Sequence, residues 1–293
     1  MSTGSRPGLV VVDKPAGMTS HDVVARVRRL AGTRKVGHAG TLDPMATGVL
    51  LVGVDRATRL LGHLMLTEKA YDAVVRLGVS TTTDDAEGEV LEETSAAGVT
   101  DEEIRVALAA QVGDIAQVPS SVSAVKVEGR RAYDRVRAGE EVELKARPVT
   151  VHVLDVHGIE RHDDVVDVEV SVRCSSGTYI RAIARDVGAA LGVGGHLTAL
   201  RRTAVGPFTL GEARTLDQLA DDLSIVGISD VARRCFPGCD LDEADAASVR
   251  VGRRLELDLG APGPVAVFDP AGEFLALYEQ RGASAAAVAV FAS

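Results

Sequence analysis

Apolar residues come in short runs along most of this chain, and the runs predict strands. A continuous apolar run indicates a buried strand, and alternation of polar with apolar residues indicates a strand with one face in the core. Strands of these two kinds are predicted at residues 9–12, 49–54, 69–78, 149–159, 165–174 and 196–206. The polar residues 157–164 predict a hairpin between the fourth and fifth of these strands.

Other segments have the three-to-four spacing of helices. Valines and a leucine recur on one face after Thr19 and Ser20, which are good N-cap residues, and predict a helix that ends at Gly32. Thr100 and Glu103 form a capping-box pattern that opens a helix to about residue 112. Further helices are predicted at 57–65, 179–191 (capped by 175–178), 215–220 and 242–249.

Strands and helices follow one another without a regular strand–helix alternation, and hairpins are frequent. This mixture predicts the α+β class. The length of 293 residues suits one large domain and one small domain. Pro237 and Gly238 mark a break, so we expect domains at 1–236 and 237–293, the second a small β domain of about five strands.

Residues 37–48 form a segment of special composition. Four of its twelve residues are Gly or Pro, which predicts a loop. The loop carries one carboxylate, Asp43, and a buried strand follows at once. A rigid loop beside a buried strand is a suitable place for a catalytic group. The alternative is a tight turn capped by Asp43, and the loop by itself does not decide between the two.

The charge is strongly negative but unevenly distributed. A net charge of −10 argues against nucleic-acid binding by bulk charge. Residues 13–35, however, carry six positive and two negative side chains, and residues 126–137 carry five positive and two negative ones. Residues 84–103 carry nine acids and no base. The two basic segments are candidates for contact with a polyanion, and ordinary solvated surfaces are the alternative.

The sequence lacks the signs of export and of structural metal. The N-terminus has no long apolar run of a signal peptide or membrane helix. Cys174, Cys235 and Cys239 make no disulfide framework, and no Cys/His pattern has zinc spacing. We therefore expect a cytoplasmic protein without a membrane anchor or a metal.

Three distant segments carry a coherent set of reactive groups. Asp43 lies in the loop, Tyr71 near the start of a strand, and Arg181 in the first turn of a helix. An arginine next to a carboxylate lowers its pKa and fixes its direction. A tyrosine ring can stack on a flat substrate and offer its hydroxyl for proton transfer. The set predicts an enzyme with a single catalytic carboxylate, unlike the paired carboxylates of most glycosidases.

These segments resemble the motifs of the tRNA pseudouridine synthase B (TruB) family. The loop 37–48 is similar to the family's signature, and the resemblance extends over about residues 9–210 in order. The other similar segments are 13–20, 69–71, 177–181 and 200–202. The resemblance implies a pseudouridine-synthase-like fold with a mixed, largely antiparallel sheet flanked by helices and loops. It also implies a small, β-rich C-terminal domain similar to PUA RNA-binding domains.

The resemblance implies an activity as well, the conversion of uridine 55 in the T-loop of tRNA to pseudouridine. The N–C glycosidic bond breaks, the base rotates and a C–C bond forms, without metal or cofactor. Asp43 would be the catalytic carboxylate, either as nucleophile at the ribose C1′ or as base toward C2′. Arg181 would pair with Asp43, and Tyr71 would stack on the flipped uracil and could take its C5 proton.

Further substrate-binding residues follow from the same resemblance. Leu200 would pack against the base, and His38 would fill the space that the flipped base leaves. Lys14 would lie at the site, where bracing the loop is favoured over substrate contact. Tyr179 is either a substrate-binding or a core aromatic. Phosphate contacts are expected from Lys35, Arg130, Arg131 and Arg202, each with a plain surface charge as the alternative.

The implied partner is tRNA, held by its T-loop and stem, and we expect the chain to act as a monomer. The C-terminal domain is expected to contact RNA or to be a structural appendage. Val122 replaces an aromatic residue that many family members have. A second hypothesis is a non-enzymatic tRNA-binding module or folding chaperone. The set of Asp43, Tyr71 and Arg181 favours the enzyme, because a binding module does not need an acid held by an arginine.

Overall fold

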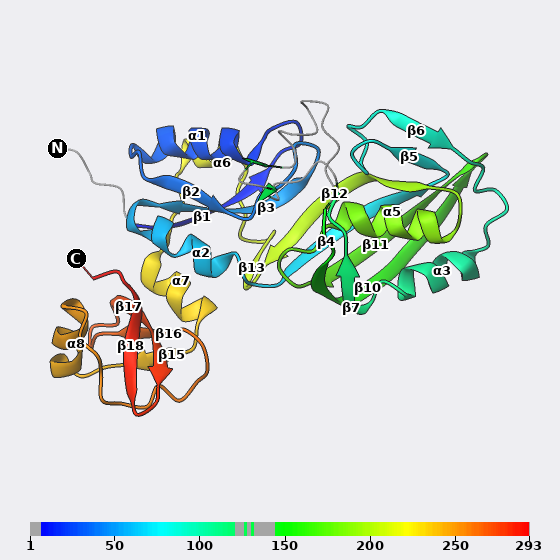
Figure 1. Cartoon of the computed structure of the whole chain (residues 1–293). Helices are drawn as coiled ribbons and strands as arrows, with labels where there is room; N and C mark the ends of the chain where they lie inside the picture. The colour runs from blue at the N-terminus through cyan, green and yellow to red at the C-terminus, as the bar shows by residue number, and fades with distance from the viewer. Residues whose placement is uncertain (1–6, 121–125, 128–129, 132–143, 293) are drawn as a thin grey trace.

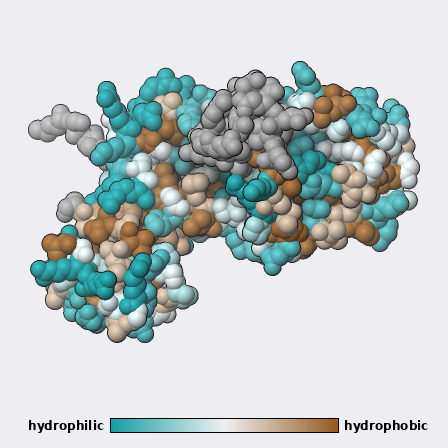
Figure 2. Space-filling model, in the orientation of Figure 1, coloured by the Kyte–Doolittle hydropathy of each residue, from teal (hydrophilic) through white to brown (hydrophobic). Residues whose placement is uncertain are grey.

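The computed structural model describes residues 7–120, 126–127, 130–131 and 144–292. The chain forms an elongated body built on one large sheet, with a smaller lobe at one end (Figure 1). In a space-filling view the lobe stands apart at the lower left (Figure 2). No helix among these described residues has the length and apolar character needed to cross a membrane.

The large sheet has ten strands and is mostly antiparallel. In spatial order its strands are β14 (Val226–Gly227), β1 (Gly8–Lys14), β3 (Thr47–Val54), β12 (Gly195–Val205), β4 (Lys69–Leu77), β11 (Val165–Cys174), β10 (Arg147–His162) and β7 (Gly113–Gln117), with β2 (Val36–Ala39) paired to β3 and β13 (Phe208–Thr209) paired to β12. β12 and β3 pair in parallel, and the other pairs are antiparallel. The predicted α+β class and largely antiparallel sheet are confirmed.

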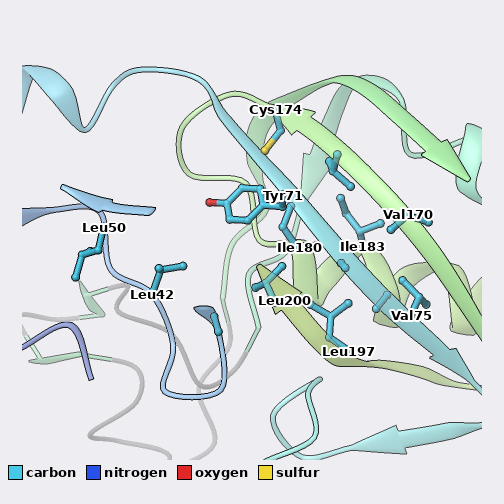
Figure 3. Packing of buried hydrophobic residues seen from close by; sticks show 14 of the residues in the cluster. Leu42, Leu50, Tyr71, Val75, Val170, Cys174, Ile180, Ile183, Leu197 and Leu200 are labelled. Carbon is cyan, nitrogen blue, oxygen red and sulfur yellow. The ribbon is translucent and has the colours of Figure 1, made fainter. Parts of the chain in front are cut away.

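The alternating pattern of β4 determines which side chains enter the core. Tyr71, Ala73 and Val75 are buried on one face, where α5 (Ile180–Ala190) covers the sheet. Ile180 and Ile183 of this helix belong to the same hydrophobic cluster (Figure 3). This packing places Tyr71 beside the first turn of the helix that carries Arg181.

The predicted helix caps are mostly present. α1 (Ser20–Ala31) begins at the N-cap Thr19, and ends at Gly32, whose φ of 63° suits a glycine. α3 (Asp101–Ala109) begins with the predicted capping box of Thr100 and Glu103. The remaining described helices are η1 (Asp55–Arg59), α2 (Leu61–Leu64), α6 (Leu216–Asp221), α7 (Ile228–Cys235) and α8 (Glu243–Arg250). The sequence analysis did not predict α7.

Two predicted loops contain strands. The first residues of the segment 37–48 belong to β2, because they pair with the second half of β3, and the true loop is 40–46. The acidic segment 84–103 contains β6 (Val90–Glu93), which forms a hairpin with β5 (Val79–Thr81). Its Asp85 is buried, at 2% exposure. Composition predicted a loop at 37–48, whereas pairing with β3 makes a strand of its first residues.

The C-terminal lobe is a four-stranded sheet with α8, rather than a domain of about five strands. Its strands are β15 (Gly238–Asp240), β16 (Val265–Phe268), β17 (Phe274–Arg281) and β18 (Ser284–Val290). One hydrophobic cluster joins Leu51 and Phe208 of the body to Phe268, Phe274 and Phe291 of the lobe. The small β domain is confirmed, and it is docked on the body by continuous apolar packing. The boundary at residue 237 stays a prediction.

Part of the predicted basic region lies outside the described residues. This holds for Val122 and, within the basic segment 126–137, for residues 128–129 and 132–137. Within that region the structure describes two short strands, β8 (Lys126–Val127) and β9 (Arg130–Arg131), which pair with each other.

Candidate active site

The loop that carries Asp43 is tied to the start of α1. Ser20, which is 1% exposed, donates from Oγ to the Leu42 carbonyl oxygen at 3.1 Å and accepts from the Leu42 N–H at 2.9 Å. The Gly17 N–H donates to the Pro44 carbonyl oxygen at 2.8 Å. The sequence analysis treated Ser20 only as a candidate cap. A side chain that pairs with backbone 22 residues away leaves no local pattern to read.

Lys14 braces the loop from the end of β1. It is fully buried, and its Nζ donates to the carbonyl oxygens of Pro15 at 2.8 Å, Met18 at 2.6 Å and Pro44 at 3.1 Å. Three acceptors match the three N–H bonds of an ammonium group. Burial lowers the pKa of Lys14 to about 8, and the negative charge of Asp43 opposes this shift. These partners favour the bracing role over substrate contact.

Arg202 holds the loop from β12. Its side chain is 1% exposed, and Nε donates to the Val49 carbonyl oxygen at 2.7 Å. Its terminal nitrogens donate to the carbonyl oxygens of Gly40 at 3.1 Å and Thr41 at 3.3 Å. The guanidinium therefore supports the loop backbone, and this geometry does not favour the phosphate contact predicted for it.

Arg181 and Asp43 meet as predicted. Arg181 Nε lies 3.1 Å from Asp43 Oδ2, while the side chains are 5% and 37% exposed. The same guanidinium lies 3.3 Å from Asp85 Oδ2 through Nη1 and donates to the Thr83 carbonyl oxygen at 2.7 Å. Arg181 is thus enclosed between two carboxylates, of which only Asp43 is reached from solvent.

The pKa of Asp43 is shifted in the direction opposite to that expected from the ion pair alone. Burial raises it above the usual aspartate value, and the nearby charge of Asp85 raises it further. The Arg181 guanidinium lowers the pKa, but by less than burial raises it. The sequence analysis considered only the arginine, because the depth of a pocket is not visible in a sequence.

A cavity of about 250 Å³ lies against this ion pair. Tyr179 and Leu200, both predicted as possible substrate contacts, are part of its wall. The predicted residues that line it are Asp43, Tyr71, Tyr179, Arg181, Leu200 and Arg202. They come from four elements of the fold: the loop, β4, the start of α5, and β12. A cavity with an apolar wall and a few convergent polar groups is the usual form of a small-molecule site.

Tyr71 forms a flat part of the wall. The residue is 7% exposed. Its hydroxyl points toward the loop that carries Leu42 (Figure 3). Burial raises the pKa of Tyr71, while the positive charge of Arg202 lowers it. The net direction keeps the phenol protonated near neutral pH. This favours stacking over a role of Tyr71 as a base.

His38 lies on β2, outside the residues that line the cavity. Its ring packs edge-to-face against His21, with ring centroids 5.3 Å apart. Its predicted contact with displaced RNA stays a prediction. Lys35 is exposed, as a phosphate contact requires, and the side chains of Arg130 and Arg131 lie outside the description. In the described part of the chain, no three His, Cys, Asp or Glu side chains gather in a metal-binding arrangement.

Comparison with protein families covers nearly the whole chain. Residues 28–180 match the family described as "TruB family pseudouridylate synthase (N terminal domain)". Residues 181–229 match "tRNA pseudouridylate synthase B C-terminal domain" and residues 236–292 match "tRNA Pseudouridine synthase II, C terminal".

Curated relatives are similar over their full length. The chain is 59% identical to "tRNA pseudouridine synthase B" of Arthrobacter sp. (strain FB24), over 97% of this chain and 96% of that protein. It is 57% identical to the protein of the same name from Streptomyces griseus subsp. griseus, over 99% of each chain.

Solved structures agree with this. "Crystal Structure of a Cbf5-Nop10-Gar1 Complex" matches with a TM-score of 0.73 and 28% identity, over 98% of this chain and 85% of that chain. "Structure of H/ACA RNP bound to a substrate RNA containing 2'-deoxyuridine" matches with a TM-score of 0.72 and 25% identity, over the same shares. The architecture is therefore the pseudouridine synthase fold. The chain belongs to the TruB family of pseudouridylate synthases.

Proposed function

We propose that this chain isomerises uridine 55 in the T-loop of tRNA to pseudouridine, with Asp43 as the catalytic carboxylate. The observation that carries the proposal is the contact of 3.1 Å between Asp43 and the buried Arg181 at the wall of a cavity. The name tRNA pseudouridine synthase B, borne by relatives with 57% and 59% identity, supports the same substrate.

The cavity suits a single flipped base. A uridine inside a folded RNA loop must first be extruded, at a cost of roughly a few kcal/mol. Tyr71 and Leu200 offer a flat ring and an apolar side chain to the extruded uracil. Such walls exclude water while the base is detached, and they allow it to turn in its own plane. Contact with a flat ring restores part of the stacking that extrusion removes.

The reaction is an isomerisation, so its atoms balance within the substrate. The bond between N1 of the base and C1′ of the ribose breaks, and a bond between C5 and C1′ forms. A proton leaves C5 and one is gained at N1. Asp43 acts on the ribose, and Arg181 directs its carboxylate and compensates its charge. Lys14 and Arg202 keep the loop in place, through six contacts to backbone carbonyl oxygens.

Action as a monomer on tRNA in the cytoplasm is part of the proposal. Asp43, Tyr71 and Arg181 of the same chain meet at the cavity, as this requires. Residues 237–293 would form the RNA-binding domain predicted for them, since Arg253 and Arg254 are exposed there. The larger part of the binding energy would come from phosphate contacts, which are weakened by salt.

The decisive experiment replaces the carboxylate without changing its shape. The Asp43→Asn variant should form no detectable pseudouridine on T-loop RNA, while its RNA affinity stays within about twofold of wild type. Asp72→Asn is the matched control. Asp72 follows Tyr71 on β4, but it is exposed and is not among the residues that line the cavity. Full activity of Asp43→Asn would refute the catalytic assignment. A wild-type chain that binds RNA without forming product would favour the non-enzymatic tRNA-binding module.

A further inference from the structure

The helix that carries Arg181 begins without a cap of its own. The sequence predicted a cap from residues 175–178, but the N-cap position is occupied by Tyr179, which makes no side-chain cap hydrogen bond. Thr178 Oγ1 donates instead to the Ser175 carbonyl oxygen at 3.0 Å. The first N–H groups of a helix need partners from elsewhere when the cap is missing.

Gln117, at the end of β7, supplies a partner at this point. Its Oε1 accepts from the Tyr179 N–H at 2.8 Å, and its Nε2 donates to the Tyr179 carbonyl oxygen at 3.1 Å. The side chain thus pairs with both backbone groups of one residue, as a neighbouring strand does. Gln117 is 2% exposed, so removal of the amide takes a buried partner from both backbone groups.

A second contact joins the same strand end to α5. Arg185 donates from Nη2 to the carbonyl oxygen of Val118, the neighbour of Gln117, at 2.8 Å. The strand end therefore holds the helix at Tyr179 and at Arg185, with Arg181 between the two. Two attachment points fix both the position of the first turns along the helix axis and their rotation about it.

Arg181 depends on that placement. Its guanidinium must reach Asp43 and Asp85 simultaneously, at 3.1 Å and 3.3 Å, from a side chain that is 5% exposed. A displacement of the first turn of α5 by about 1 Å would lengthen or break at least one of these contacts, and errors of this size can reduce rates by about 100-fold.

We propose that Gln117 is a positioning residue for the isomerisation. Its amide fixes the start of α5 and thereby holds Arg181 in the geometry that directs the Asp43 carboxylate. The inference rests on the proposed function. Gln117 itself is not among the residues that line the cavity, so its effect on the rate passes through Arg181.

The first test removes the amide from the full-length chain. Gln117→Ala should lower the single-turnover rate of pseudouridine formation on T-loop RNA by about 10- to 100-fold. The RNA dissociation constant should stay within about twofold of wild type. The acid limb of the rate–pH profile should also move to higher pH, because a weaker Arg181 contact leaves the raising effect of burial on the Asp43 pKa less opposed. Loss of global stability alone would not move this limb.

The second test keeps the size of the side chain. In Gln117→Glu an ionised carboxylate faces the Tyr179 carbonyl oxygen and repels it, whereas a protonated carboxyl again donates and accepts. The rate relative to wild type should therefore recover as the pH falls. This variant also answers the question if the alanine variant does not fold.

Gln218→Ala is the matched control. Gln218 accepts through Oε1 from the N–H of Thr215, the N-cap of α6, at 3.0 Å. It therefore pairs with the N-cap residue of a helix, as Gln117 does, but it is not among the residues that line the cavity. Its substitution should leave the rate within about twofold of wild type. Rates within twofold for both Gln117 variants, or a loss explained entirely by weaker RNA binding, would overturn the inference. A wild-type chain without activity would overturn the proposed function itself, which is a distinguishable result.

Discussion

Arg181 and Arg202 are two buried arginines that contact the same loop, and their partners differ. Arg181 lies between the carboxylates of Asp43 and Asp85. Arg202 donates to backbone carbonyl oxygens of the loop and of β3. Both side chains are at most 5% exposed.

The difference separates chemistry from architecture within one site. A guanidinium that faces a carboxylate changes the pKa and direction of that carboxylate, so it acts on the reacting group. A guanidinium that faces carbonyl oxygens holds backbone in place. Arg202 also lowers the pKa of Tyr71 through its charge, but it directs no carboxylate. We therefore expect changes at Arg181 to affect turnover and changes at Arg202 to affect stability.

The largest expected effect is on turnover in Arg181→Lys. Lysine keeps the charge but loses the planar fork that reaches two carboxylates, so the rate should fall by about 100- to 1000-fold. RNA affinity should change little, because Arg181 is enclosed by protein. Single-turnover kinetics with T-loop RNA and a separate binding titration measure the two quantities. Unchanged turnover would remove the distinction between the two arginines.

The next effect concerns the stability of Arg202→Met. Methionine fills part of the space but removes the Arg202 donors from three carbonyl oxygens, two in the loop and one in β3. The free energy of unfolding should fall by about 2–4 kcal/mol. Urea denaturation of the full chain measures this. If the variant were as stable as wild type while losing all turnover, Arg202 would belong with Arg181 as a part of the chemistry.

The rate of isomerisation should fall both at acid pH and at alkaline pH. Asp43 must be ionised to act, and its pKa is raised, so the acid limb should lie above the usual range for aspartate. The alkaline limb should lie near pH 8, the value to which burial lowers the pKa of Lys14. A neutral amine has two N–H bonds for the three carbonyl oxygens that Lys14 now serves. A rate that stays constant from about pH 5 to pH 10 would contradict both assignments.

The contribution of Lys14 to the free energy of unfolding should rise with pH over the range in which the rate falls. Between about pH 8 and its ordinary pKa of 10.5, the unfolded chain binds more protons at Lys14 than the folded chain does. This term therefore makes the folded state more stable as the pH rises through that window, while the rate falls. Urea midpoints at several pH values, compared between wild type and Lys14→Met, isolate the term.

The smallest effect is expected from Arg201→Ala. Arg201 adjoins Arg202 on β12 but pairs with Asp13 at 2.8 Å, and the side chains are 40% and 25% exposed. An ion pair this open to solvent should contribute about 1 kcal/mol or less. The rate should stay within about twofold of wild type. A loss as large as that of Arg202→Met would show that burial is not what separates these neighbours.

Much of the fold was predictable because its signals are local. The alternation in β4, the capping box of α3 and the glycine after α1 each depend on residues close in sequence. β2 was missed because a glycine-rich segment becomes a strand only through its partner, β3. The burial of Asp85 was missed for a similar reason. It lies in the segment 84–103, where nine acids among twenty residues suggest a solvated surface.

The main residues of the site were predicted from the sequence, but the direction of the Asp43 pKa shift was not. The motifs named Asp43, Tyr71 and Arg181, and the structure brings all three to one cavity. The roles of Ser20 and Gln117 remained hidden, because each side chain pairs with backbone far away in sequence.

The sequence by itself determined the family, the class of fold and the reactive groups, since these depend on residue types in a fixed order. Only the tertiary structure decided that burial outweighs Arg181 in setting the pKa of Asp43, and that Arg202 donates to backbone carbonyl oxygens. Solvation and hydrogen-bond partners depend on the whole surroundings of a group, and those surroundings exist only after distant segments have packed together.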